Sequence, residues 1–148
     1  MNDAATASPQ IDFYVSPGTT HEQRLLLACR LADKAFRSGH RVYIHCRDAA
    51  QAQQLDTMLW SFQATSFVPH ALVGSDDTPV QIGHASTTWN IDDVLINLDH
   101  TIPENFAQFR RVLEVVVQEQ SVLDNTRDHF RQYRQLGHNP QRRELPNA

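Results

Sequence analysis

The sequence lacks any apolar run long enough to cross a membrane, which takes about 20 residues. Its first ten residues, MNDAATASPQ, have neither a basic start nor an apolar core, so they do not form a secretory signal. We therefore expect residues 1–10 to be a flexible N-terminal leader. We also expect a cytoplasmic protein that makes no contact with membranes.

Cysteine is scarce, since Cys29 and Cys46 are the only two in the chain. Two cysteines cannot build the disulfide framework of a small secreted domain. Both lie in apolar patterns, which favours buried, reduced thiols.

Motifs that bind phosphate groups are also missing. The first turn expected between a strand and a helix, Ser16–Thr20, contains one glycine next to a proline. A turn that holds a phosphate needs several glycines, because backbone N–H groups must approach the anion closely. The pattern therefore argues against a bound nucleotide.

The side chains needed for a metal site or for covalent catalysis do not occur at suitable spacing. The eight histidines form no HxxxH pair, there is no CxxC, and no serine or cysteine stands in a nucleophile elbow. Asp92–Asp93 and Asp99–His100 fit caps and turns at strand ends. We expect no metal, no cofactor and no catalytic residues.

Excess positive charge is absent from the chain as a whole, which has a net charge of −4. Wrapping a nucleic acid needs many lysines and arginines on the phosphates, so that function is disfavoured. The charge is uneven, however, because residues 121–148 hold five arginines against three acidic residues. This asymmetry indicates one local anionic partner.

Strand and helix patterns alternate along the chain with short connections. This order predicts a single α/β domain over residues 11–138, with a mostly parallel central sheet flanked by helices. Strands are expected at Ile11–Val15, Arg41–Cys46, Pro79–Ile82 and Asp93–Leu98, and helices from Thr20 to Gly39 and from Asp48 to Trp60.

Two further segments are predicted after the last of these strands. Pro103 suits a first helical turn, and Phe106, Phe109, Leu113 and Val116 mark one face of the element that follows. Residues 139–148 show no periodicity and are expected to be a C-terminal tail.

The stretch from about Ser121 to His138 reads as an amphipathic helix. Arg127, Arg131 and Arg134 fall within a stripe roughly 60° wide on this helix, beside an apolar arc that includes Phe130. Such a surface can hold a ligand that is both apolar and anionic. An ordinary surface helix with solvated arginines has the same periodicity, so the pattern alone leaves both interpretations open.

Trp60 and Phe67 flank a polar link between two elements. Exposed aromatic side chains are typical of binding hot spots, whereas a buried pair would only cover the end of the core. Both interpretations fit the sequence.

Leu55-Asp56-x-x-Leu59-Trp60, followed by Ser66-Phe67-Val68-Pro69-His70, resembles the chi subunit family of bacterial DNA polymerase III. Further matching stretches follow the family order over roughly residues 11–138. They are Phe13-Tyr14, Ser38-Gly39-x-Arg41-Val42, Pro79-Val80-x-Ile82, Asp93-x-Leu95-Ile96-x-Leu98 and Tyr133-Arg134-x-x-Gly137.

The resemblance implies a Rossmann-like, three-layer α/β fold without a bound nucleotide. It also implies an accessory subunit without catalysis of its own, in an assembly with DNA-directed DNA polymerase (nucleotidyltransferase) activity. Implied partners are the psi subunit, the clamp loader through psi, and the acidic, phenylalanine-ended C-terminal tail of single-stranded DNA-binding protein. A repair helicase is a further candidate partner, and DNA itself is contacted mostly indirectly.

By position, the tail pocket of this family maps onto Trp60, Phe67, Val116, Arg127 and Phe130. Leu123 stands where a relative has lysine, so the set of contacts to carboxylates differs there. Helix geometry adds Arg131 and Arg134 as candidate site residues, and the psi interface is not placed.

An enzyme is the alternative from another class. A nucleotide- or phosphate-utilising α/β enzyme would need an unorthodox site at the carboxyl ends of the strands, around Ser16–Thr20 and Asp99. A shift of the melting temperature by a nucleotide would favour that alternative.

Overall fold

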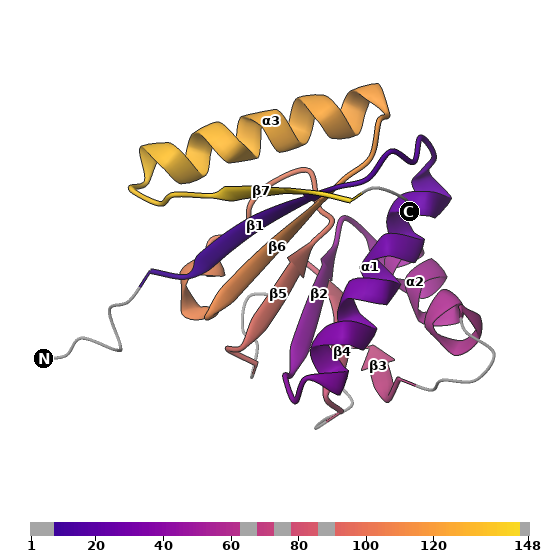
Figure 1. The fold of residues 1–148 in the computed structure, drawn as a ribbon. Helices are drawn as coiled ribbons and strands as arrows, with labels where there is room; N and C mark the ends of the chain where they lie inside the picture. Colours follow the sequence, from indigo (N-terminus) through magenta and orange to yellow (C-terminus); the bar gives the residue numbers. More distant parts are fainter. Residues whose placement is uncertain (1–7, 63–67, 73–77, 86–90, 146–148) are drawn as a thin grey trace, which may run out of the picture.

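A parallel sheet, with seven strands among the residues that the structure describes, forms the centre of the molecule (Figure 1). The computed structural model describes residues 8–62, 68–72, 78–85 and 91–145. The strands are β1 (Gln10–Val15), β2 (Val42–Cys46), β3 (His70–Leu72), β4 (Val80–His84), β5 (Val94–Asn97), β6 (Arg111–Val116) and β7 (Gln141–Glu144). The helices are α1 (His21–Arg37), α2 (Ala49–Ser61) and α3 (Gln120–Gln135), with a short 3₁₀ helix at Phe106–Gln108.

The order of strands across the sheet is β3-β4-β2-β5-β6-β1-β7, and all neighbouring strands run parallel. Helices α1 and α2 cover one face and α3 covers the other (Figure 1). The three-layer α/β fold predicted from the sequence is therefore confirmed, and the sheet is more completely parallel than expected.

Local sequence signals set the ends of the first two helices. Thr20 and Gln23 form a reciprocal capping box at the start of α1, and Gly39 follows the helix with a φ of 91°, which suits glycine. The Asp48 side chain accepts a hydrogen bond from the backbone N–H of Gln51 at the start of α2. Both helix starts agree with the sequence prediction.

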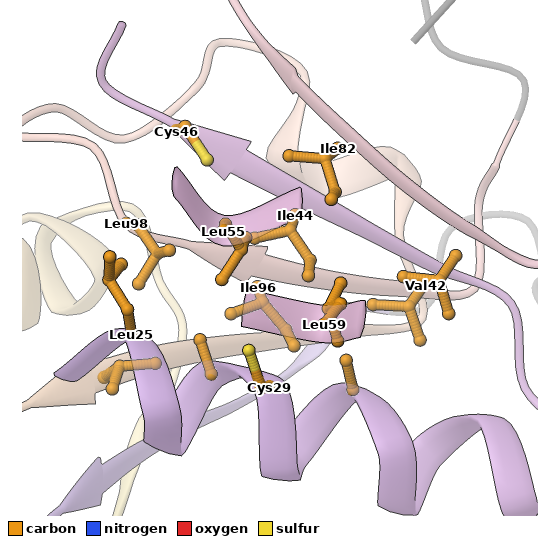
Figure 2. Packing of buried hydrophobic residues seen from close by; sticks show 14 of the residues in the cluster. Leu25, Cys29, Val42, Ile44, Cys46, Leu55, Leu59, Ile82, Ile96 and Leu98 are labelled. Atoms are coloured by element: carbon orange, nitrogen blue, oxygen red, sulfur yellow. The ribbon is translucent and has the colours of Figure 1, made fainter. Parts of the chain in front are cut away.

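The larger part of the core lies between the sheet and α1 and α2 (Figure 2). Every residue of β2 and β5 is buried, as expected for central strands covered on both faces. Cys29 and Cys46 are buried in this core, and burial raises the pKa of each thiol to about 12. The prediction of buried thiols is confirmed.

The segment after Pro103 differs from the expected single helical face. The 3₁₀ helix contains Phe106, whereas Leu113 and Val116 belong to the strand β6. Helical spacing of the aromatic and aliphatic residues was misleading there, because every residue of Val112–Val117 is buried, and the strand lies between β5 and β1. All of these residues except Glu114 are branched and apolar, and such a run favours a central parallel strand.

The expected C-terminal tail is also partly wrong, because residues 141–144 form β7 at the edge of the sheet. The α/β domain thus continues past residue 138. Residues 1–7 of the expected leader and 146–148 of the expected tail lie outside the described residues.

Strand β7 is attached through a buried carboxylate on β1. Arg143 donates through Nε to Oδ1 of Asp12 at 2.8 Å, and Arg111 on β6 donates through Nη2 to Oδ2 at 3.0 Å. The Asp12 side chain is fully buried. One carboxylate therefore links three neighbouring strands.

Candidate functional site

An open pocket of about 470 Å³ lies between α3 and the end of the sheet formed by β6, β1 and β7. Its lining combines apolar side chains from the strands with polar and basic ones from the helix. The lining residues are Phe13, Val15, Val116, Gln118, Leu123, Thr126, Arg127, Phe130, Arg131, Arg134 and Arg142.

The base of this pocket is aromatic and aliphatic. The rings of Phe13 and Phe130 have centroids 5.1 Å apart, and Val15 and Val116 are both buried beside them. Phe13 also meets the edge of the Tyr133 ring, at a centroid distance of 5.9 Å. These contacts hold the base in a fixed shape that can accept an apolar group.

Four arginines line the pocket, and three of them are paired with an acidic residue of their own element. The pairs are Arg127 Nη1 to Asp124 Oδ1 at 3.7 Å, Arg131 Nη1 to Asp128 Oδ1 at 3.2 Å, and Arg142 Nε to Glu144 Oε2 at 2.6 Å.

All three pairs are exposed to solvent, with between 55% and 67% of each side chain accessible. Exposed pairs of this kind contribute about 0.2–1 kcal/mol at most. An anionic ligand can therefore replace the internal carboxylates at little cost. Arg134 has no ion pair among the described residues and is available to an anion directly.

The structure brings together six of the eight site residues predicted from the sequence. Those six are Val116, Leu123, Arg127, Phe130, Arg131 and Arg134. Trp60 does not line the pocket, because it lies in the last turn of α2 and its ring packs on His70 of β3, at the other edge of the sheet. Phe67 lies outside the described residues.

Sequence reasoning missed the contribution of β1 and β7 to the pocket. Phe13 was noted only as part of a strand, and Arg142 was placed in the expected tail. The segment Gln141–Glu144 contains no apolar residue, so its pattern carries no strand signal. Its place depends on distant contacts with β1, namely the backbone pairing of the two strands and the hydrogen bond from Arg143 to Asp12.

A buried polar cluster holds α3 against the sheet behind the pocket. Glu114 on β6 accepts from Tyr133 at 2.8 Å, from Asn97 Nδ2 at 3.0 Å, and from His129 Nδ1 at 3.0 Å. The other ring nitrogen of His129 lies 2.7 Å from the carbonyl oxygen of His100. Since both ring nitrogens face acceptors, His129 fits this site as an imidazolium.

Metal binding and membrane insertion find less support than anion binding in the residues that the structure describes. Among them, no group of three or more histidine, cysteine or acidic side chains is placed to hold a metal ion. None of the described helices is long and apolar enough to span a membrane. Asp99 contacts His45 Nε2 at 3.2 Å, but neither residue lines the pocket.

Comparison with known proteins places the chain in one family. A family model described as "DNA polymerase III chi subunit, HolC" matches residues 9–141. The DNA polymerase III subunit chi of Pseudomonas aeruginosa is 44% identical over 138 residues, covering 93% of this chain and 97% of the relative. The subunits of the same name from Escherichia coli and Haemophilus influenzae are 36% and 34% identical, each over 76% of this chain and over 80% and 81% of the relatives. The chain belongs to the DNA polymerase III chi subunit family.

Proposed function

We propose that this chain is a non-catalytic, cytoplasmic adaptor in bacterial DNA replication. It binds the acidic C-terminal tail of single-stranded DNA-binding protein and joins the clamp loader through the psi subunit. The observation that supports this proposal best is the pocket beneath α3, which has an aromatic base and arginines along its edges.

The two parts of the pocket suit the two chemical features of such a tail. The terminal phenylalanine ring packs on Phe13 and Phe130, while arginines of α3 bind carboxylates by charge-assisted hydrogen bonds. Leu123 extends the apolar base at the position where a relative has lysine. This substitution moves the balance of the pocket from charge toward apolar contact.

The adaptor works through effective concentration. Single-stranded DNA coated by its binding protein displays many tails close together, so one pocket of modest affinity is enough to keep the polymerase assembly nearby. Modest affinity also allows the adaptor to move from one tail to the next.

Titration calorimetry with the C-terminal peptide of the cognate single-stranded DNA-binding protein tests this function. We expect the full chain to bind the peptide and to lose binding when the terminal phenylalanine is removed. Added salt should weaken binding, because exposed charges are screened.

A charge-matched pair of variants tests where the peptide binds. Arg127→Ala should weaken binding by up to about fivefold, the range expected for one exposed ion pair. Arg30→Ala removes an exposed arginine from α1 on the other face of the sheet and should leave affinity unchanged. Equal affinities for the two variants would show that the peptide binds elsewhere.

Trp60 belongs to a second exposed surface that we assign to the psi subunit. Its side chain is 60% accessible, and Leu72 on the neighbouring strand β3 is 39% accessible. An adaptor needs two separate surfaces to hold two partners at once. Because Trp60 lies far across the sheet from the pocket, both partners can bind together.

Trp60→Ala is expected to weaken the complex with psi by more than about 1 kcal/mol, as for an aromatic hot spot. The same variant should bind the tail peptide with unchanged affinity. Gln53→Ala, at an exposed position two turns earlier on α2, is the control for both measurements. Loss of peptide binding by Trp60→Ala alone would place Trp60 in the peptide site after all.

A further inference from the structure

Strand β7 carries two adjacent arginines that point to opposite faces of the sheet. Arg142 pairs in register with Phe13 and lines the pocket on the α3 side. Arg143 pairs with Tyr14 and binds Asp12 on the side covered by α1. The contact of Arg143 with the buried Asp12 thus helps to hold the strand in place, and the strand presents Arg142 to the pocket.

Arg142 stands on the wall of the pocket opposite the arginines of α3. It comes from the edge strand, whereas Arg127, Arg131 and Arg134 come from the helix. A carboxylate in the pocket can therefore be approached by guanidinium groups from two sides. Bound from two sides, a carboxylate is held in a defined position more firmly than by the helix alone.

The partner of Arg142 in the empty pocket is Glu144, two residues further along the same strand. Side chains two apart on a strand share a face, and Arg142 Nε lies 2.6 Å from Glu144 Oε2. Both side chains are largely accessible, at 64% and 67%. The contact is therefore open to competition from a carboxylate of another molecule.

We propose that Arg142 binds a carboxylate of the peptide, and that Glu144 occupies Arg142 only while the pocket is empty. This inference rests on the proposed function. Binding exchanges one carboxylate for another at the same guanidinium. Glu144 thereby lowers the affinity for anionic peptides and favours those whose carboxylate reaches Arg142 in good geometry.

This arrangement also accounts for a pocket that lacks a cation at Leu123. Leu123 leaves the start of α3 apolar, while Arg142 supplies a positive charge from the facing strand. Ligand carboxylates are expected to turn toward β7.

Three variants of the full chain, titrated with the tail peptide, test the roles of both side chains. Arg142→Gln should weaken binding by about two- to fivefold, the range for an exposed ion pair, and Glu144→Gln should strengthen it by a similar factor. In the double variant, the strengthening by Glu144→Gln should disappear. If it persists, Glu144 acts only through its general charge and does not compete for Arg142, which would overturn that part of the proposal.

Two modified peptides identify the carboxylate that Arg142 binds. One peptide has an amidated C-terminus, and the other has asparagine in place of each aspartate. The unaltered protein should bind at least one of these modified peptides less tightly than the unmodified acidic peptide. For that peptide, the loss of affinity should be smaller in Arg142→Gln, because the missing carboxylate no longer has Arg142 as its partner. Reduced loss in either case supports the proposal and names the source of the carboxylate.

The outcomes separate this inference from the proposed function. If the unaltered chain binds the tail peptide and Arg142→Gln binds every peptide with the same affinity as the unaltered chain, the inference is wrong and the adaptor function stands. If the unaltered chain does not bind the peptide, both are wrong. Melting temperatures of the variants should match that of the unaltered protein, because Arg142 and Glu144 are exposed.

Discussion

Replacement of Glu114 by alanine is expected to lower the free energy of unfolding by about 3–5 kcal/mol, the usual loss when one partner of a buried ion pair is removed. Glu114 is fully buried, and so is its partner His129. The variant also leaves the hydroxyl of Tyr133 and the side-chain amide of Asn97 without this acceptor. Each lost buried hydrogen bond adds to the cost.

The pH dependence of the free energy of unfolding is a second test of the buried cluster around Glu114. Burial alone lowers the pKa of His129, but hydrogen bonding to Glu114 and its negative charge outweigh burial, and the pKa is raised. A raised pKa means that the protonated histidine stabilises the folded state, and this stabilisation is complete when the pH is below the ordinary pKa of about 6.5. It is lost as the pH rises from about 6.5 through the pKa of the folded state.

Urea unfolding at about pH 6 and about pH 9 measures this contribution. In the unaltered protein, His129 lowers the free energy of unfolding at the higher pH relative to the lower pH. His129→Gln should lack this contribution to the difference. His21 and His45 have lowered pKa values, chiefly through burial, so they change stability in the opposite direction. The difference between the unaltered protein and His129→Gln isolates His129 from both.

Glu104→Ala is the matched control for Glu114→Ala, because Glu104 is exposed. It should change the free energy of unfolding by no more than about 0.5 kcal/mol. A similarly small effect of Glu114→Ala would mean that the buried pair contributes little. An unchanged pH profile in His129→Gln would mean that His129 is not an imidazolium in the folded protein.

The helix of the pocket was predictable because its pattern is local. Arg127, Arg131 and Arg134 follow the period of a helix, and Phe130 marks its inner border, so the sequence alone places them on one side. Likewise, the capping residue Thr20 and the terminating Gly39 fix α1 through short-range interactions. These predictions needed no knowledge of which elements meet in space.

The other wall of the pocket depends on long-range contacts that no local pattern contains. Arg142 joins the site only because β7 adds to the sheet beside β1. In that pairing Gln141 lies next to Asp12, 129 positions earlier in the chain, so the relation is not local. For the same reason, the sequence did not show that Trp60 lies away from this pocket. Its neighbour in space, His70, lies beyond a link whose path the sequence does not specify.

Asp12→Asn is expected to lower the free energy of unfolding by about 2–3 kcal/mol, since hydrogen bonds to charged groups contribute about 1.5–3 kcal/mol each and the released arginines regain water. The buried carboxylate accepts from Arg111 and Arg143, and asparagine would point an N–H donor at one of them. Arg143 is 47% accessible, so hydration recovers part of the loss. Strand β7 should suffer most, because it is an edge strand whose residues are all exposed.

Hydrogen exchange locates the effect of Asp12→Asn, and Asp128→Asn controls for the loss of a carboxylate. Asp128 pairs with Arg131 on the surface of α3, so its variant should cost less than about 1 kcal/mol. In Asp12→Asn, amides of Gln141–Glu144 should exchange faster, while those of β2 should change only with global stability. Uniform acceleration across the sheet would show that Asp12 supports the whole core rather than the strand that carries Arg142. In that case the position of Arg142 would depend on the backbone pairing of β7 with β1, including the hydrogen bond from Leu145 N–H to the Val15 carbonyl at 2.8 Å.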